Sequence, residues 1–248
     1  MKTPYRRVSG REEIISAVGD ALFASHFAGD SSRGLAAEGA AAWDRRWSNR
    51  RTVMAHGPAH AAAPLVAALV DELRPDMVTV PEEIYDGLPD RARPPKGSRW
   101  VWFYTLAAPP PHEAEARCDW LGSHEHADVA ALLDEAYPRA LNRFRAGDPD
   151  QRWFGVRDES GALAACGRAT AADNAGPSLS SIAVHPKARR QGLASAMTSW
   201  AVRRLFEAGH SLVGLGSYAE ATSVHRIYRR LGFQSACMMT SGRLEPRS

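Results

Sequence analysis

Residues 183–197 read AVHPKARRQGLASAM, in which cationic and polar side chains come directly before a glycine and the start of an apolar helix. The first N–H groups of such a helix have no partner within it, and the helix dipole adds positive potential there. Gly192 lets a ligand approach the backbone closely, while Arg189 and Arg190 add forked donors. The pattern Arg-x-x-Gly-x-Ala between a strand and a helix therefore favours a pyrophosphate site. Taken alone, so short a motif also fits an ordinary solvated basic turn.

The segments around this turn predict an α/β domain. SLSSIAVHP reads as the preceding strand, and residues 192–209 as a helix with its apolar side chains on one face. Upstream we expect a strand at 116–122, a helix begun by Ser123, and a hairpin of RWFGVRD and ALAACGRAT around the turn ESG. Downstream the sequence predicts a strand SLVGLGSY, a helix ended by Gly232 and a last strand SACMMTSGRL.

The N-terminal part of the sequence predicts a similar order of strands and helices, although its sequence identity to the C-terminal part is low. Ser9 and Glu12 form a capping-box pattern before a helix at 12–27, and GLAAEGAAAW is ambiguous. Then RRTVMAHG, HAAAPLVAALVDEL, DMVTV and PEEIYDGL read as strand, helix, strand and helix, followed by a strand SRWVWFYTLA. The turn HGPAHAAAP has no arginine before its helix. Prolines at 109–111 predict a linker at 107–113, between an N-terminal lobe (1–106) and a second domain (114–248).

Composition narrows the class of protein. The chain has 248 residues and 44% hydrophobic residues, which is enough for a packed core. Its net charge of +3 suits an anionic small ligand and does not favour a nucleic-acid partner. Three widely spaced cysteines predict free thiols in a reducing compartment, and we find neither a signal-peptide pattern nor a membrane-spanning run. We expect a soluble, cytoplasmic protein.

SIAVHPKARRQGLA, together with the later IYRRLGF, resembles the GNAT superfamily of acyl-CoA N-acyltransferases over about residues 114–240. The matching positions are Pro186, Arg189, Gly192, Ala194, Tyr228, Gly232 and Phe233. The resemblance implies a mixed α/β (α+β) GNAT fold for the C-terminal lobe, with a mixed, splayed sheet flanked by helices. The layout also resembles tandem members and glycine N-acyltransferase-like proteins. That likeness implies a smaller, degenerate GNAT-like α/β lobe at the N-terminus.

The resemblance further implies a site for acetyl-CoA or another acyl-CoA as co-substrate, without a metal. Backbone groups of Ile182, Ala183 and Val184 would bind the pantetheine arm as an added strand, and an N–H on this strand would stabilise the oxyanion. The diphosphate would be held by the turn, which comprises Arg189, Arg190, Gln191, Gly192, Leu193 and Ala194. Tyr228 would be the catalytic residue that donates a proton to the thiolate. The alternative is that Tyr228 only packs its helix on the sheet.

Some positions depart from the family's pattern. Ala221 stands where many members have an asparagine, so one hydrogen bond to the co-substrate is expected to be missing. The strand SLSSIAVHP carries no carboxylate, so no general base is assigned, and Glu220, His225 or a water held by Ser180 all stay open. His124 and His126 have no partner ligands at metal spacing. Four tryptophans are expected in the core or between the lobes: Trp43, Trp47, Trp100 and Trp102.

We therefore expect an acyl-CoA-dependent N-acyltransferase, most simply an N-acetyltransferase, that acylates an amine of a small molecule by direct attack. The acceptor is expected in the cleft between the lobes. One alternative is acyl transfer from the phosphopantetheine arm of an acyl carrier protein. Another is a non-catalytic CoA-sensing or partner-binding module. A third is an RNA-acting acyltransferase, for which the net charge of +3 is weak support.

Overall fold

The N-terminal half contributes six strands to a computed structural model that describes residues 5–47, 50–95, 97–140, 142–143 and 151–245. Its elements are β1 (Arg6–Ser9), α1 (Gly10–Ala17), α2 (Ala21–Phe27), β2 (Arg33–Ala37), β3 (Ala40–Trp47), β4 (Arg50–His56), α3 (Ala59–Leu73), β5 (Met77–Pro81), α4 (Glu82–Asp86), η1 (Asp90–Ala92) and β6 (Ser98–Thr105). The side chain of Trp47 lies outside the described residues.

The C-terminal half repeats much of this order. Its elements are η2 (Glu113–Arg117), β7 (Cys118–Leu121), η3 (Ser123–Glu125), α5 (His126–Ala136), β8 (Gln151–Arg157), β9 (Leu163–Thr170), β10 (Ser178–Val184), η4 (Pro186–Ala188), α6 (Leu193–Glu207), β11 (Val213–Tyr218), α7 (Thr222–Arg230) and β12 (Gln234–Arg243). The sequence of β4, α3, β5 and α4 thus parallels that of β10, α6, β11 and α7, as the similar order in the sequence predicts.

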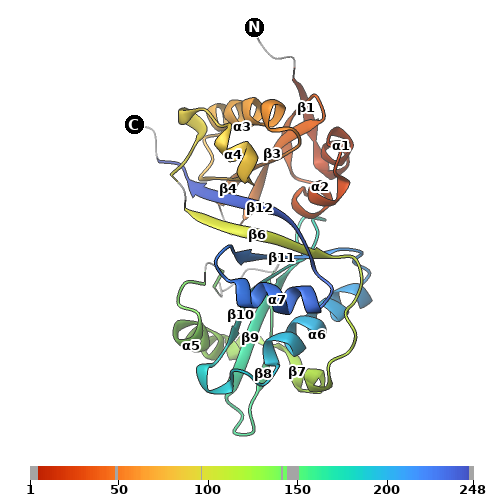
Figure 1. Ribbon diagram of the computed structural model, residues 1–248, viewed down its shortest axis with the longest axis vertical. Coiled ribbons are helices and arrows are strands. Elements are labelled where there is room, and N and C mark those ends of the chain that lie inside the picture. Colours follow the sequence, from red (N-terminus) through yellow and green to blue (C-terminus); the bar gives the residue numbers. More distant parts are fainter. Residues whose placement is uncertain (1–4, 48–49, 96, 141, 144–150, 246–248) are drawn as a thin grey trace.

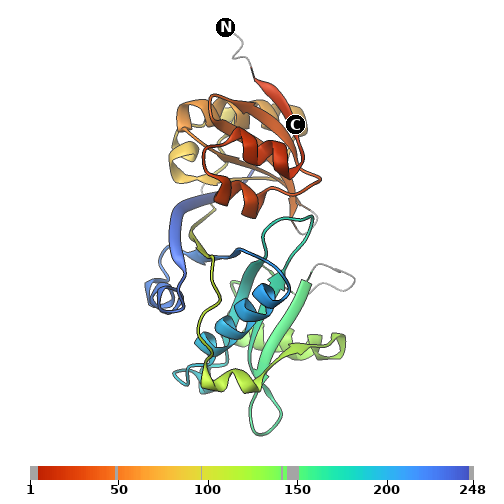
Figure 2. The ribbon, with the colours of Figure 1, turned by 90° about the vertical axis from the view of Figure 1, so that its right-hand side faces the viewer.

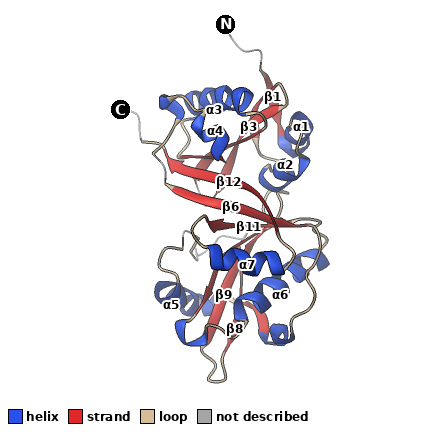
Figure 3. Cartoon of the chain, viewed as in Figure 1, coloured by secondary structure: helices blue, strands red, loops and turns tan. Residues whose placement is uncertain are grey.

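All strands of the described residues join one 12-stranded sheet in the order β1-β2-β3-β4-β5-β12-β6-β11-β10-β9-β8-β7 (Figures 1 and 3). Two pairs of neighbours are parallel, β4 with β5 and β10 with β11, and the others are antiparallel. The fold is therefore mixed α/β with a largely antiparallel sheet, which confirms the predicted class.

The centre of the sheet is built by a reciprocal crossing of strands. β6 precedes the proline-rich segment at 107–113 but pairs with β11 and β12, both of which follow it. β12, the last strand of the described residues, also pairs with β5 of the N-terminal half, from Met239↔Pro81 to Arg243↔Met77. Figure 1 shows β12 and β6 running side by side between the upper and lower groups of helices. The division into two lobes at 107–113 stays a prediction. Strand pairing continues without a break from the N-terminal half of the chain to the C-terminal half.

Helices cover both faces of the sheet in each half. Because side chains alternate along a strand, Val53 and Ala55 of β4 face α3, whereas Met54 faces α1 and α2. In the other half, Phe154 and Val156 pack with α6, whereas Trp153 packs with α5. Figure 2 shows α6 lying across the strands of the lower half.

The N-terminus differs from the prediction in two places. The helix expected over 12–27 is two helices, because the chain turns extended at Val18 and restarts at Asp20, whose carboxylate accepts the Leu22 N–H at 2.9 Å. The Ser9 side chain makes no capping bond; instead its N–H donates to the Glu13 carboxylate at 2.9 Å. The ambiguous segment GLAAEGAAAW forms the hairpin of β2 and β3.

Candidate active site

Strands β10 and β11 separate after two residues of pairing. Their parallel register covers Ser178↔Gly214 and Leu179↔Leu215, while β10 continues along β9 to Val184↔Ala165. An irregularity between Ser180 and Ala183, with Ser181 at φ 52°, bends β10 at this point. β11 meanwhile continues along β6. The gap leaves the β11 side of Ile182, Ala183 and Val184 without a strand partner in the described structure, which is the opening that an added extended ligand needs.

A cavity of about 660 Å³ fills this gap. Its walls include Leu193, Ala194 and Ser195 of α6, together with Val224, Ile227 and Tyr228 of α7. Ala136 and Tyr137, at the end of α5 on the opposite face of the sheet, line it too. The cavity therefore reaches both faces of the sheet. The structure brings nine predicted site residues to its wall (Ile182, Ala183, Val184, Arg189, Arg190, Gly192, Leu193, Ala194 and Tyr228), and Gln191 is not among the lining residues.

The turn before α6 has the geometry of an anion cradle. Gly192 is the N-cap of α6 with φ 75° and ψ −1°, a left-handed conformation that favours glycine. Arg190, two residues earlier, also has a positive φ, of 63°. No side chain caps the helix. Within the described residues, the backbone N–H groups of 192–195 make no hydrogen bond to the protein. These donors are free to bind an anionic ligand.

The two arginines of the turn have different surroundings. The Arg189 guanidinium donates to the carbonyl oxygens of Val184 at 3.3 Å and Ala136 at 3.4 Å, so it ties the turn to β10 and to the C-terminal end of α5. In the described parts of the chain, neither Arg190 nor Lys187 has a carboxylate within 4.0 Å. Arg190 and Lys187 thus supply uncompensated positive charge beside the free N–H groups.

Tyr228 is packed and yet reaches the cavity. Its side chain is 7% exposed, and its ring lies 5.7 Å from that of Phe103 and 6.0 Å from that of Phe233. Among the described residues its hydroxyl has no hydrogen-bond partner. Burial, with a smaller contribution from Tyr137, raises the pKa of Tyr228 above its ordinary value near 10. The phenol therefore keeps its proton at neutral pH, so both predicted roles, packing and donation, are compatible with the geometry.

Sequence reasoning did not identify Tyr137, which enters the cavity from the other face. Tyr137 is the C-cap of α5, and its N–H donates to the Leu133 carbonyl at 2.9 Å. Burial, and secondly its interaction with the hydroxyl of Tyr218, raises the pKa of Tyr137 to about 12. A tyrosine followed by proline at a helix end is a signal for a helix stop, and nothing in that pattern points to a site.

The three candidates for the general base differ in their exposure and in their hydrogen-bond partners. Glu220 is exposed and lies 3.7 Å from Arg139. His225 is buried, with its Nε2 3.0 Å from the carbonyl oxygen of Tyr218, so it packs α7 against β11. Ser180 lines the cavity, and its Oγ is buried without a partner in the described structure. A buried hydroxyl of this kind is satisfied at low cost by an ordered water.

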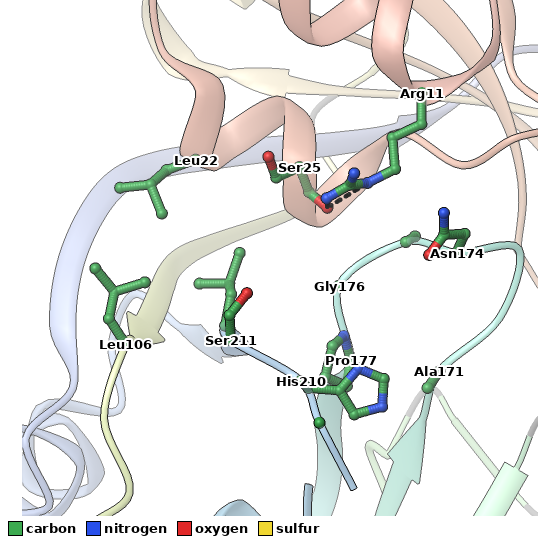
Figure 4. Close-up of a pocket in the computed structure, with 13 residues that line it drawn as sticks. Arg11, Leu22, Ser25, Leu106, Ala171, Asn174, Gly176, Pro177, His210 and Ser211 are labelled. Carbon is green, nitrogen blue, oxygen red and sulfur yellow. Dashed lines mark hydrogen bonds between the residues drawn. The ribbon is translucent and has the colours of Figure 1, made fainter. Parts of the chain in front are cut away.

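A second cavity, of about 350 Å³, lies where α1 and α2 meet the loops before β10 and β11 (Figure 4). Arg11 lines it and donates to the Ser25 carbonyl oxygen at 3.4 Å. His210 and Asn174 reach it from the opposite half. None of the predicted site residues lines this cavity.

Within the residues that the structure describes, no helix is long and apolar enough to cross a bilayer. Among the same residues, no group of three or more His, Cys, Asp or Glu side chains is placed to hold a metal ion, so the absence of a metal remains a prediction. Cys118, Cys166 and Cys237 are free thiols, and burial raises the pKa of each to about 12.

Comparison with known proteins agrees with this geometry. Residues 110–233 match the sequence model of the acetyltransferase (GNAT) family. A GCN5-related N-acetyltransferase from Kribbella flavida shares the fold with a TM-score of 0.58 at 19% identity, covering 97% of both chains. A tandem GNAT protein from the clavulanic acid biosynthesis pathway has a TM-score of 0.52 at 11% identity, covering 99% of both chains. A GNAT-family protein from Novosphingobium aromaticivorans, at 22% identity, has a TM-score of 0.56 over 82% of this chain and 92% of its own. No curated protein matches the sequence.

Proposed function

Because the chain belongs to the GNAT acetyltransferase family, we propose that it transfers an acyl group, most simply acetyl, from acyl-CoA to the amine of a small molecule. The observation that carries this proposal is the cavity between β10 and β11, which ends at the unpaired N–H groups before α6. An elongated thioester with an anionic end matches both features. The pantetheine amides would pair with β10 between Ile182 and Val184, and the diphosphate would bind the turn at Gly192.

The cavity supports a direct attack of the acceptor on the thioester. A donor held along α6 and α7 leaves the opposite face, at Tyr137 and Ser180, for the amine. The amine nitrogen would form a bond to the acyl carbon, the carbon–sulfur bond would break, and the thiolate would leave. An alkyl ammonium has a pKa near ~10, so it must first lose a proton. We assign that transfer to a water held by Ser180, whose Oγ has no protein partner in the described residues, and this water would relay the proton through the open cavity to bulk solvent.

Tyr228 would stabilise the departing sulfur. A phenol with a pKa above its ordinary value is a weaker acid than a thiol, whose pKa is about 8.5. Complete proton transfer from Tyr228 to the thiolate is therefore uphill. We propose that its O–H donates a hydrogen bond to the sulfur as negative charge develops, and that the proton comes finally from the amine or from solvent.

A carrier-protein donor is the second candidate, and the surface of α7 favours it. Ser223 and Ile227 line the cavity, and Arg226 and Arg230 follow them at a spacing of three residues, on the same side of the helix. Both arginines are exposed, and neither has a carboxylate partner among the described residues. An acidic carrier protein could bind to this cationic surface of α7, beside the cavity, through opposite charge.

We further propose that the N-terminal half binds no acyl-CoA. The corresponding turn, after β4, has Gly57 at φ 116°, where an added Cβ would lie 2.5 Å from the Cα of Ala40. The turn therefore packs tightly against β3, and its sequence HGPAHAAAP offers no arginine.

The acceptor amine would bind in the opening of the cavity near Tyr137 and Tyr218.

The test is release of free thiol from acetyl-CoA in the presence of a panel of amines, including amino acids, polyamines and aminoglycosides. Turnover with any amine supports the acyltransferase. Thiol release from S-acetyl-pantetheine on a carrier protein but not from acetyl-CoA would favour the second candidate. Binding of CoA without turnover of any amine would support the non-catalytic alternative and contradict this proposal.

A further inference from the structure

We infer that His112 binds the diphosphate of the donor through its Nε2–H, and so makes the site selective for a CoA-type donor. His112 lies in the segment that connects β6 to β7, directly before η2. The inference rests on the proposed function, because it concerns the anionic end of the same ligand. Nothing in the motif around Gly192 points to this histidine, which is distant from it in the sequence.

The imidazole of His112 lies against the turn before α6. Its Cε1 and Nε2 are each 3.5 Å from the position that a Cβ on Gly192 would occupy. This is ordinary van der Waals contact, so the edge of the ring that carries Nε2 faces Gly192. The same turn presents the unpaired N–H groups of residues 192–195. The histidine therefore reaches the cradle from a segment outside it.

The hydrogen bond on the other ring nitrogen fixes which nitrogen carries the proton. Nδ1 of His112 accepts the Ala114 N–H at 3.2 Å, and this bond caps η2. In the neutral ring, Nδ1 is then the acceptor and Nε2 the donor. Within the described parts of the chain, Nε2 has no acceptor. The Nε2–H of His112, which has no acceptor among the described residues, therefore points toward a turn whose unpaired backbone N–H groups are also hydrogen-bond donors.

The segment that carries His112 is held to α6 by a second network. The His112 N–H donates to Glu115 Oε1 at 2.9 Å, and the Ser199 hydroxyl of α6 donates to the same oxygen at 2.6 Å. Arg203, one turn further along α6, has its Nε 3.4 Å from Glu115 Oε2 and balances the charge of that carboxylate. These contacts fix His112 relative to the N-terminus of α6, so its ring needs little reordering to meet a ligand.

This arrangement bears on the class of donor. Nε2–H of His112, the free N–H groups of the turn, Arg190 and Lys187 together present donors and cations without an acceptor. A diphosphate carries two adjacent anionic groups and can use both the turn and the histidine at once. A carrier-bound phosphopantetheine has a single phosphodiester at this point, and it gains less from such a pair of sites. His112 therefore favours CoA over the carrier protein as the donor.

Two substitutions separate the ring nitrogens. In His112→Asn, the side-chain oxygen replaces Nδ1 and keeps the cap on Ala114, but nothing reaches the position of Nε2. In His112→Gln, the amide nitrogen reaches that position and restores the donor. His60→Asn is the matched control, since the His60 side chain is 78% exposed in the N-terminal half. The dissociation constant of CoA is measured by calorimetry for the full-length protein and each variant, with the melting temperature of the free protein.

His112→Asn is expected to weaken CoA binding about tenfold, the low end for a hydrogen bond to a charged group. His112→Gln is expected to bind CoA within about threefold of the wild type, although it loses the cap on Ala114 and melts at a lower temperature. His112→Asn and His60→Asn are expected to keep the wild-type melting temperature, and His60→Asn also the wild-type affinity. Unchanged CoA affinity in His112→Asn overturns the inference and leaves the proposed function intact. Equal losses in both His112 variants also overturn it, since the ring and not the donor would then matter. A wild type that binds no CoA would remove the proposed function as well.

Discussion

Replacing Gly192 by aspartate is expected to abolish most CoA binding while leaving the free protein folded. An added Cβ at this position meets only the ring of His112, at 3.5 Å, so no clash arises. The left-handed φ of 75° makes any side chain less favourable, by about 1 kcal/mol. In a chain of this size that corresponds to a fall of about 2–4 °C in melting temperature.

The effect on the complex is larger. Two like charges at contact distance repel by about 4 kcal/mol at an effective dielectric constant near 20. Even half of that value weakens CoA binding about 30-fold. At a CoA concentration 100 times the wild-type dissociation constant, the ligand stabilises the wild type by about 2.7 kcal/mol, and it would stabilise the variant by less than about 1 kcal/mol.

Thermal unfolding with and without CoA measures both effects. Gly161→Asp is the matched control, because Gly161 has φ 85° and open space around it, and lies in the turn between β8 and β9. It should lower the melting temperature by a similar amount and keep the full CoA-induced shift. A Gly192→Asp protein that retains the wild-type shift would refute the assignment of the diphosphate to this turn.

Two further predictions concern buried titratable side chains. Because Tyr228→Phe removes a hydrogen bond to the departing sulfur, it should lower kcat by about 10-fold to 100-fold with little change in CoA affinity; steady-state kinetics test this, and a fall in stability alone would leave Tyr228 as a packing residue. His26 is fully buried beside Ser178, and desolvation lowers its pKa to about 3, against 6.5 when unfolded. Because only the unfolded chain takes up this proton, stability should fall by about 2 kcal/mol from pH 8 to pH 5. In urea unfolding at both values, His26→Gln should lose less; an equal loss in both proteins would contradict this.

The part of the site that could be predicted from sequence is the part that is local. The turn at Gly192 and the helix that follows are specified by neighbouring residues, and the structure has α6 from Leu193 to Glu207. Cappings and helix periodicity act over a few residues, so they leave a readable pattern. That Ile182–Val184 belong to the same site as the turn at 189–194 was implied by the resemblance to the GNAT superfamily. Of these proposed ligands, all except Gln191 line one cavity.

The residues that come from elsewhere in the chain could not be found in this way. His112 follows a run of prolines, and only the contact of η2 with α6 brings it to Gly192. Tyr137 ends a helix on the opposite face of the sheet. The strands that pair with β6 and β12 could not be predicted either. The sequences SRWVWFYT and QSACMMTSGR indicate that each segment is a strand, but they do not indicate which strand lies beside it.

The crossing of β6 and β12 has a consequence for synthesis on the ribosome. The chain emerges from its N-terminus, so β5 and β6 are made long before β12, which both must pair with. Until residues 234–243 leave the exit tunnel, β5 keeps an open edge, and open edges recruit other strands. The N-terminal half therefore depends on the last strand to close its sheet, and a ribosome stalled before residue 234 would display an aggregation-prone edge to chaperones.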